Sequence, residues 1–354
     1  MNDPIVDLRS DTVTRPSPAM RRAMYEAEVG DDVYREDPTV NRLEARATEI
    51  FAREAGLFVP SGTMGNQTAI KVHTRPGQEV ICEERSHIYN FEMAMMSAFS
   101  GVLPRTVYAE DGILAWELIA PLVRGRSDHR ARTGLIELEN TSNLAGGSVY
   151  PLEVSNDIVE RAHAAGLPVH LDGARIFNAS VALGRSVVEL TSKFDSVMFC
   201  LSKGLGAPVG SMLVGNKEFI EEARLVRKML GGGMRQAGVL AAAGLVALQE
   251  SPPLLHIDHE NAKLLAEGLA QLPGVTIDAN KVVTNILFVD VSGTGFSAPE
   301  VSQGLKAQGI LANPYNPKLL RMVTHRDVDR AGCERALEVL RAILAAPRKA
   351  GAAL

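Results

Sequence analysis

Residues 169–179 read VHLDGARIFNA, and this stretch decides how the chain folds. Val169–Leu171 is a short apolar run that predicts a buried strand ending at Asp172, and Gly173–Ala174 predicts a tight turn that leads to Arg175. A carboxylate at the end of a buried strand is costly unless a positive group meets it. The partner is either Arg175, as an ion pair or helix cap, or a protonated pyridine nitrogen, which would turn a bound ring into an electron sink.

The same rhythm of short apolar runs and helical stretches continues on both sides of this segment. It predicts an α/β domain with a mainly parallel sheet, helices on both faces and active groups at the carboxyl ends of the strands. The further strands are expected at Leu57–Val59, Glu79–Cys82, Leu135–Leu138, Ser196–Leu201 and Ser211–Val214. Helices are expected at Ala19–Ala27, Thr39–Ala55, Thr63–His73, Phe91–Phe99, Ile158–Ala165 and Glu218–Lys228.

The pattern changes after a proline pair near Glu250–Pro253, which interrupts a long apolar helix. A smaller α+β domain is expected beyond it, with helices at Asn261–Gln271, Glu300–Gln308 and Val328–Leu344 and a strand at Ile286–Val291. An extended arm, Ile5–Arg15, comes first. We therefore expect an N-terminal arm over residues 1–15, a large domain over 16–254 and a small C-terminal domain over 255–354. The Ala-rich tail after Leu340 is the only low-complexity block in the sequence.

The composition predicts a globular cytoplasmic enzyme. Of the 354 residues, 46% are apolar and 22% are charged, and the net charge of -5 argues against a nucleic-acid surface. The three cysteines, Cys82, Cys200 and Cys333, lie far apart without metal-ligand spacing, so we expect reduced thiols and no metal site. The N-terminal sequence has no signal-peptide pattern and no apolar run is long enough for a membrane span.

The segment LSKGLGAPVGS, residues 201–211, places Lys203 after an apolar strand and before small residues. A lysine that forms a Schiff base needs a desolvated pocket and neighbours small enough to admit a bulky aldehyde, and Gly204 and Gly206 meet the second need. Taken alone, the pattern also fits a surface lysine at a strand end.

A third segment, VPSGTMGNQTA over residues 59–69, follows a predicted strand and opens a helix. The free N–H groups at a helix N-terminus bind phosphate, with the hydroxyls of Ser61 and Thr63 beside them, although simple N-capping by either residue fits the same letters. Neither this segment nor GLGAPVG matches a Walker or dinucleotide-binding spacing. An anion-binding turn, an Asp-x-x-Arg and a Ser-Lys-Gly, each after a strand, are together the parts of a pyridoxal-phosphate (PLP) site.

In this order, DLRSDTVTRPS, GDDVYREDPTVNRLE, SGTMGNQTA, LENT, LDGARIFNA, LSKGLGAPVGS, KMLGGGMRQAG and RMVTH closely resemble the low-specificity L-threonine aldolases. The resemblance implies the aspartate-aminotransferase-like fold of PLP enzymes (fold type I), with a mainly parallel seven-stranded sheet in the large domain and a smaller α+β C-terminal domain. It also implies retro-aldol cleavage of the Cα–Cβ bond of L-threonine, L-allo-threonine and other β-hydroxy-α-amino acids to glycine and an aldehyde.

The resemblance assigns roles to matching positions. Lys203 would hold PLP as a Schiff base, Asp172 would pair with the ring nitrogen, Arg175 would meet the phenolic oxygen and His87 would stack on the ring. Without the resemblance, His87 fits a core histidine or a helix cap equally well. The resemblance implies phosphate binding for Gly62, Thr63, Ser202 and Lys228. It implies substrate or cross-subunit contacts for Ser10, Tyr34, Ser142, Arg235 and Arg321.

Five of these positions carry further consequences. Ser10 and Arg321 would hold the substrate carboxylate, and Tyr34 and Arg235 would reach a neighbouring subunit's site, which implies a homo-oligomer with shared sites, a dimer of dimers. Ser142 departs from the family, which commonly has histidine after LENT. Because serine does not titrate near neutral pH, the general base and the threo or allo preference stay open, with water, His87 and the phosphate as the candidates.

Other functions remain open for the same scaffold. A PLP-dependent amino-acid racemase or a β-eliminating lyase would use the same residues, since PLP permits several bond cleavages. A non-catalytic α/β protein that binds a small anion is the alternative from another class.

Overall fold

The structure is a computed structural model that describes residues 4–345, so the end of the Ala-rich tail, residues 346–354, lies outside it. The chain divides into two compact units. The large unit is Thr14–Leu255, and the small unit combines residues 1–13 with residues 256–354. The N-terminal arm thus belongs to the same compact unit as the C-terminal segment.

Within the described part of the large unit, seven strands form one sheet in the order β2-β8-β7-β6-β5-β3-β4. Strands β3 to β7 run parallel to one another, and only β8 is antiparallel to its neighbours, β2 and β7. The prediction of a mainly parallel seven-stranded sheet is therefore confirmed. The strands are β2 (Ala55–Val59), β3 (Glu79–Glu83), β4 (Leu103–Val107), β5 (Thr133–Glu139), β6 (Val169–Asp172), β7 (Ser196–Cys200) and β8 (Ser211–Gly215).

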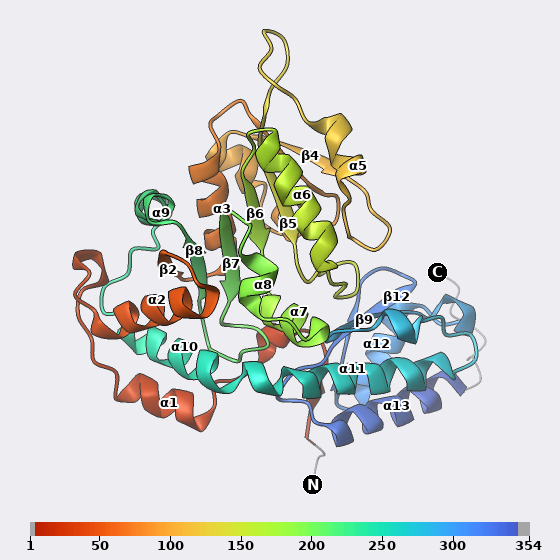
Figure 1. The fold of residues 1–354 in the computed structure, drawn as a ribbon. Coiled ribbons are helices and arrows are strands. Elements are labelled where there is room, and N and C mark those ends of the chain that lie inside the picture. The colour runs from red at the N-terminus through yellow and green to blue at the C-terminus, as the bar shows by residue number, and fades with distance from the viewer. Residues whose placement is uncertain (1–3, 346–354) are drawn as a thin grey trace. The chain divides into compact units, whose positions relative to one another are not determined.

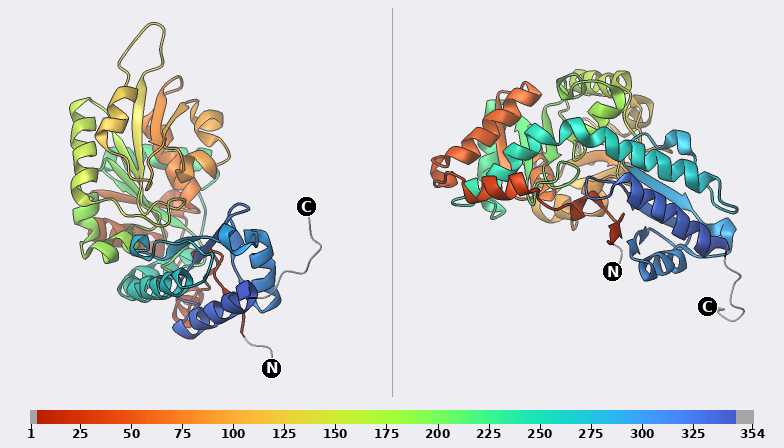
Figure 2. Two further views of the ribbon diagram at one scale, coloured as in Figure 1. Left: turned by 90° about the vertical axis from the view of Figure 1, so that its right-hand side faces the viewer. Right: turned by 90° about the horizontal axis from the view of Figure 1, so that it is seen from below.

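Helices cover both faces of this sheet, with α3 on one side and α6 on the other (Figures 1 and 2). The central parallel strands β3, β5, β6 and β7 are buried along their whole length, as expected for a sheet with two covered faces. The helices are α1 (Pro18–Tyr25), α2 (Pro38–Phe51), α3 (Gly62–His73), α4 (His87–Asn90), α5 (Trp116–Ile119), α6 (Leu152–Ala164), α7 (Ile176–Leu183), α8 (Val187–Thr191), α9 (Lys217–Met229) and α10 (Gly238–Glu250).

Local signals account for where several helices begin. The side chains of Ser17 and Asp37 accept hydrogen bonds from backbone N–H groups at the starts of α1 and α2, and each cap is followed by a proline at the first helical position. Ser61 caps α3 in the same way, with its hydroxyl oxygen 3.2 Å from the Met64 nitrogen. Helix α8 begins with a capping box between Ser186 and Glu189.

The predicted helix over Phe91–Phe99 is wrong. The chain forms the single turn α4 and then a short π-helix, η3 (Met96–Ser100), and between them Met93 and Ala94 have φ values of 53° and 56°. The neighbouring Glu92 is fully buried and accepts hydrogen bonds from three side chains. These long-range contacts override the helical periodicity of this apolar stretch.

The small unit is an α+β structure. In its described residues a three-stranded antiparallel sheet has the order β11-β12-β9, and the arm strand β1 pairs in parallel with β10. The arm is extended only in part, because the 3-10 helix η1 (Asp11–Val13) follows β1. The remaining elements are β1 (Val6–Asp7), β9 (Ile286–Asp290), β10 (Ile310–Leu311), β11 (Asn313–Pro314), β12 (Leu319–Val323), α11 (Leu255–Ala270), α12 (Ala298–Ala307) and α13 (Arg330–Ala345).

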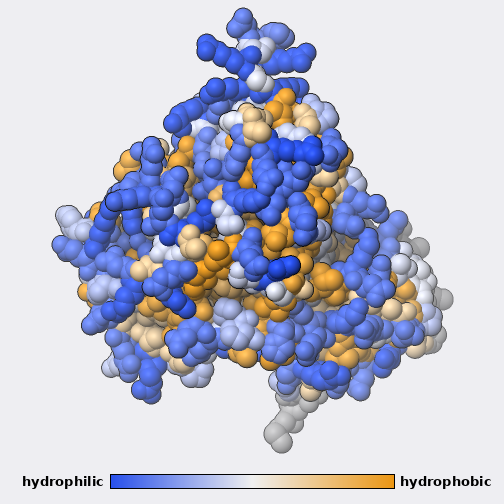
Figure 3. All heavy atoms as spheres, in the orientation of Figure 1, coloured by the Kyte–Doolittle hydropathy of each residue, from blue (hydrophilic) through white to orange (hydrophobic). Residues whose placement is uncertain are grey.

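Among residues 4–345, no single helix is both long and apolar enough to cross a bilayer; α10 and the segment Pro252–Ala270 pass that test only as a bent pair, by length and composition. On the face shown in Figure 3, the projecting loop at the top is hydrophilic. It corresponds to residues 124–132, RGRSDHRAR, which connect to β5.

Candidate active site

Three adjacent parallel strands deliver the polar residues of the site to one edge of the sheet. Strand β5 ends at Glu139, β6 ends at Asp172, and Lys203 follows the end of β7. Glu139 and Asp172 are register partners, and the Gly173 nitrogen donates to the Met198 carbonyl of β7 over 2.8 Å. The sheet order therefore places two of the predicted groups on neighbouring strands, at the carboxyl ends where α/β proteins bind ligands.

Asp172 is a buried carboxylate held by N–H donors. Its side chain is only 1% exposed, Oδ2 accepts from the Asn66 amide nitrogen over 2.7 Å, and Oδ1 accepts from the Ala174 backbone nitrogen over 3.0 Å. Arg175 directly precedes α7 and is also buried, with a guanidinium nitrogen 3.5 Å from the Asn143 side-chain oxygen. A buried carboxylate that accepts these hydrogen bonds remains suited to a further, positive partner.

A chain of buried hydrogen bonds lies behind Asp172, and the residue types determine which atom donates and which accepts in each bond. The amide nitrogen of Asn66 lies against two carboxylates, so its oxygen must accept, and the His170 Nε2 atom at 3.1 Å must donate to it. Burial lowers the pKa of His170 to about 3, so its Nδ1 is unprotonated and accepts from the Ser196 hydroxyl over 2.8 Å. The Ser196 oxygen in turn accepts from His73 Nε2 over 2.8 Å.

His87 and Glu92 form a second pair on the same side of the sheet. His87 Nδ1 lies 2.7 Å from Glu92 Oε1, and the two oxygens of Glu92 also accept from Asn66 over 2.9 Å and from Gln67 over 2.6 Å. Burial lowers the pKa of His87, but the hydrogen bond to Glu92 and the charges of Asp172 and Glu92 outweigh it, so the pKa lies above its usual value. The charge of Lys203 opposes this rise.

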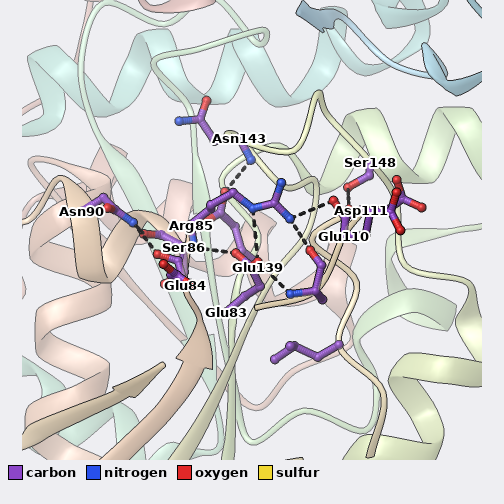
Figure 4. A network of polar contacts seen from close by, with 12 residues as sticks. Glu83, Glu84, Arg85, Ser86, Asn90, Glu110, Asp111, Glu139, Asn143 and Ser148 are labelled. Atoms are coloured by element: carbon purple, nitrogen blue, oxygen red, sulfur yellow. Dashed lines mark hydrogen bonds and ion pairs between the residues drawn. The ribbon is translucent and has the colours of Figure 1, made fainter. Parts of the chain in front are cut away.

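Glu139 connects His87 to the loop after β5. One of its oxygens accepts from the Asn143 backbone nitrogen over 2.6 Å (Figure 4). The other accepts from the His87 backbone nitrogen, also over 2.6 Å. Burial and the nearby charge of Asp172 raise the pKa of Glu139 to about 7. Glu137, two residues earlier on β5, is fully buried, and neither of its oxygens has a hydrogen-bond partner among the described residues. Burial raises the pKa of Glu137 well above its usual value.

Lys203 is half-buried, and its amine makes no hydrogen bond or ion pair within residues 4–345. Its carbonyl is fixed, because it accepts from the Thr14 hydroxyl over 3.1 Å and from the Gly206 nitrogen over 2.8 Å. The small residues that follow are required by the geometry: a Cβ atom on Gly204 would lie 3.2 Å from Leu255, and Gly206 has a φ of 78°. The backbone is therefore anchored while the reactive amine stays available.

The N-terminus of α3 lies against the end of β7. A Cβ atom on Gly62 would come within 3.0 Å of the Cys200 sulfur, so only glycine lets the helix approach this closely. Among the described residues the N–H groups of Gly62 and Thr63 have no acceptor. Two exposed N–H groups at the positive end of a helix dipole fit a phosphate.

The last turn of α9 adds a positive charge, Lys228, and the loop after it lies near this helix. A Cβ atom on Gly232 would overlap the Met64 sulfur in the first turn of α3. The side chain of Lys228 packs on Gly233, where a Cβ atom would lie 2.9 Å from the Lys228 Cδ atom. Lys228 is exposed and Ser202 half-buried. Together, the amine, the buried carboxylate and the N–H groups fit PLP, whose aldehyde, ring nitrogen and phosphate require these three kinds of partner.

A family model described as β-eliminating lyase matches residues 7–292 of the chain. The chain belongs to this family. The low-specificity L-threonine aldolase 1 of Arabidopsis thaliana is 49% identical over 328 residues, which cover 91% of this chain and 92% of that protein.

Solved structures share the fold. The threonine aldolase of Leishmania major aligns with a TM-score of 0.82 at 21% identity, covering 96% of this chain and 100% of that one. The serine palmitoyltransferase of Sphingomonas wittichii aligns with a TM-score of 0.74 at 19% identity, covering 96% of this chain and 87% of that one. A structure of SPT with PLP aligns with the same values. The aspartate-aminotransferase-like fold of type I expected from the sequence is confirmed.

The other positions named by the resemblance to this family lie on both units. In the large unit, Ser142 is buried, whereas Tyr34 is 72% exposed and Arg235 is exposed and pairs with Asp31 over 2.9 Å. In the small unit, the Arg321 guanidinium donates to the Arg9 carbonyl over 3.2 Å, and the neighbouring Ser10 accepts from the Thr12 hydroxyl over 2.9 Å.

Sequence reasoning gave no role to four residues that the structure places around the predicted groups: Asn66, Glu92, Glu139 and His170. Asn66 and Glu139 stand in the family motifs SGTMGNQTA and LENT, and His170 directly precedes LDGARIFNA. Glu92 follows His87 by five residues. A buried polar residue in an apolar stretch was the available signal, but its partners come from other elements and are not visible in the sequence.

Proposed function

We propose that this β-eliminating lyase family member is a PLP-dependent aldolase that cleaves L-threonine, L-allo-threonine and other β-hydroxy-α-amino acids to glycine and an aldehyde. The observation that carries the proposal is the placement of Lys203 and the buried Asp172 after neighbouring parallel strands, with the N-terminus of α3 against the end of β7. The name and 49% identity of the Arabidopsis relative support the choice of reaction.

The residues divide into those that hold PLP and those that hold the substrate. When bound, PLP supplies an electron sink for the bond that breaks. Lys203 holds its aldehyde carbon, Asp172 keeps the ring nitrogen protonated and Arg175 donates to the phenolic oxygen. The phosphate is assigned to the N–H groups of Gly62 and Thr63, with Ser202 and Lys228 as further donors, and His87 stacks on the ring.

The substrate carboxylate is assigned to Arg321 and Ser10. A guanidinium presents two parallel N–H donors to a carboxylate, and the hydrogen bond from Arg321 to the Arg9 carbonyl holds it next to Ser10 within the small unit. Fixing the carboxylate orients the Cα–Cβ bond, and this orientation accounts for much of the acceleration in such reactions. Ser142 is assigned to the control of the threo or allo preference.

We also propose that the active form is a homo-oligomer, a dimer of dimers, in the cytoplasm. Tyr34 and Arg235 are large exposed side chains near each other through Asp31, as a cross-subunit role requires. The three cysteines are free and buried, which fits a reducing compartment. Light scattering of the purified protein tests the assembly, and a monomer with full activity would contradict it.

The experiment that tests the reaction begins with colour. The purified protein should be yellow, because lysine-bound PLP absorbs violet light, and borohydride should fix the cofactor covalently to Lys203. A panel of L-threonine, L-allo-threonine, phenylserine, serine and alanine is then assayed for products. Glycine with an aldehyde supports the proposal, whereas D-amino acids or pyruvate would indicate the racemase or the β-eliminating lyase. A colourless protein that binds only phosphate would overturn it.

A further inference from the structure

We propose that Glu92 is a positioning residue that holds His87 with its Nδ1 protonated, so that Nε2 is the proton acceptor for the β-hydroxyl group of the substrate. This inference rests on the proposed aldolase function and names the base that function leaves open. It gives a role to a carboxylate that the sequence places in an apolar stretch and that the structure buries completely.

The contacts of Glu92 determine its charge and the tautomer of its partner. Glu92 is 0% exposed, and its two oxygens accept N–H groups from the amides of Asn66 and Gln67. An oxygen that accepts from Asn66 over 2.9 Å and lies 2.7 Å from His87 Nδ1 belongs to an ionised carboxylate, so Nδ1 carries the hydrogen. In a neutral imidazole the lone pair is then on Nε2.

A second anchor fixes the histidine backbone. Glu139 accepts from the His87 nitrogen over 2.6 Å, while Glu92 accepts from its ring. The His87 side chain is 26% exposed whereas that of Glu92 is fully buried, so the pair presents the histidine and not the carboxylate. Because both ends of His87 are held by acids that are themselves buried, the ring keeps one orientation.

The charges that face His87 raise the pKa of its imidazole above the usual value. Glu92 and Asp172 raise its pKa, Lys203 lowers it, and Glu139 is the remaining acid in contact with its backbone. Burial lowers the pKa of His87, but the net shift of this pKa is upward. Since a proton acceptor must be deprotonated to act, activity should rise with pH through the pKa of His87.

The other buried histidines of this side of the sheet are unsuited to the role. His170 and His73 are both engaged with Ser196, and burial lowers their pKa values to about 3 and about 4. Ser142 stands where the family commonly has a histidine. Of these three histidines, His87 is therefore the one suited to the reaction.

The proton and electrons balance in this step. The β-hydroxyl proton moves to His87 Nε2, and the O–H electron pair becomes the second bond of the aldehyde carbonyl. The Cα–Cβ pair remains with the glycine fragment, whose Cα then takes up a proton. His87 returns its proton to solvent or to that carbon, so no further reactant is required.

The test compares Glu92→Gln with the wild-type holoenzyme. Glutamine has one acceptor oxygen for three N–H donors and no charge, so we expect kcat to fall by about 10- to 100-fold while KM changes by less than about threefold. The acid limb of the pH profile of kcat/KM should move down by about one pH unit, because the negative charge that raises the pKa of His87 is gone. Glu137→Gln is the matched control, since it changes an equally buried acid that has no hydrogen-bond partner among the described residues, and its profile should be that of the wild type.

A second readout does not depend on activity. Hydrogen exchange at the imidazole C2 atom, followed by mass spectrometry of the peptide that contains His87, reports the pKa of this histidine in the folded holoenzyme. We expect the midpoint to be about one unit lower in Glu92→Gln, with His129 in the exposed loop as the unchanged reference. An unchanged midpoint together with an unchanged acid limb would overturn the proposal.

The two proposals fail in different ways. If the wild type yields no aldehyde from any β-hydroxy-α-amino acid, the aldolase function is wrong, while the exchange midpoint still decides whether Glu92 controls His87. If Glu92→Gln does not fold, Glu92→Asp carries the test: the retained charge should keep the midpoint within about 0.5 unit, and the shorter side chain should lower kcat. Full kcat in that variant would contradict a positioning role.

Discussion

Replacing Asp172 with asparagine separates the structural part of the site from its chemical part. The change removes one charge with almost no change in size. The two carboxylate oxygens accept from Asn66 and from the Ala174 nitrogen over 2.7 and 3.0 Å, at a side chain that is 1% exposed. Asparagine has one oxygen, so one of these two buried donors must face an NH2 group.

The magnitude follows from these two contacts. A buried donor without an acceptor costs roughly 1–3 kcal/mol, so we expect the free energy of unfolding to fall by about 2 kcal/mol, already in the cofactor-free protein. For a unit of this size that corresponds to a melting temperature lower by about 4–8 °C. The loss of the charge opposite the ring nitrogen should also lower kcat by about 1000-fold, which is about 4 kcal/mol.

The assay is thermal unfolding of the cofactor-free and PLP-loaded proteins, with aldehyde formation measured in parallel. Glu137→Gln on the neighbouring strand is again the control, because it converts an acid to an amide where no hydrogen bond is lost, and it should change stability by less than about 1 kcal/mol. If Asp172→Asn unfolds at the wild-type temperature and keeps more than a tenth of the activity, the reasoning about this carboxylate is refuted.

Four further outcomes are expected. Lys203→Ala should lose turnover by several orders of magnitude and the borohydride-fixed colour with it, yet unfold close to the wild-type temperature, because the amine has no partner in the described structure; near-normal turnover would end the assignment. Ser142→His should shift the threo/allo ratio without abolishing PLP binding. Because the larger ring enters a 3% exposed site beside Gly112, the free energy of unfolding measured in urea should fall by about 1–3 kcal/mol. An unchanged ratio would show that this position has no role in the preference. Arg321→Ala should raise KM for threonine by at least about tenfold, with Arg321→Lys recovering little of it, as steady-state kinetics would measure. The pKa of His170 is lowered to about 3 in the folded protein, so its neutral form stabilises the fold above pH 6.5. This contribution is lost as the pH falls toward 3. The free energy of unfolding should therefore fall less between pH 6.5 and pH 3 in His170→Gln than in the wild type.

Much of the fold was predictable because its signals are local. The strands that end at Asp172 and Cys200, the helix that follows Ser61 and the break at the Pro252–Pro253 pair were all expected to within a few residues. Buried parallel strands are nearly continuous apolar runs, and caps and prolines act on adjacent residues, so such elements are visible without tertiary information.

The elements that were missed depend on distant contacts or on the position of a strand in the sheet. Strand β4 (Leu103–Val107) lies at the edge of the sheet, where no residue is fully buried, so its sequence has no apolar run. The helix expected over Phe91–Phe99 does not form, because Glu92 turns inward to Asn66, Gln67 and His87. Helix α11 begins at Leu255, about two turns before the expected start.

The sequence by itself determined the chemical groups: a lysine, an acid and an anion-binding turn, each after a strand, in an order that is similar to one family of PLP enzymes. Only the tertiary structure decided which groups control them. Asn66 donates to both Asp172 and Glu92, and Glu139 joins His87 to the loop that carries Ser142. The physical reason is that reactive groups follow from residue type and local spacing, whereas the charge, the tautomer and the orientation of a buried group are determined by hydrogen bonds to residues far away in the chain.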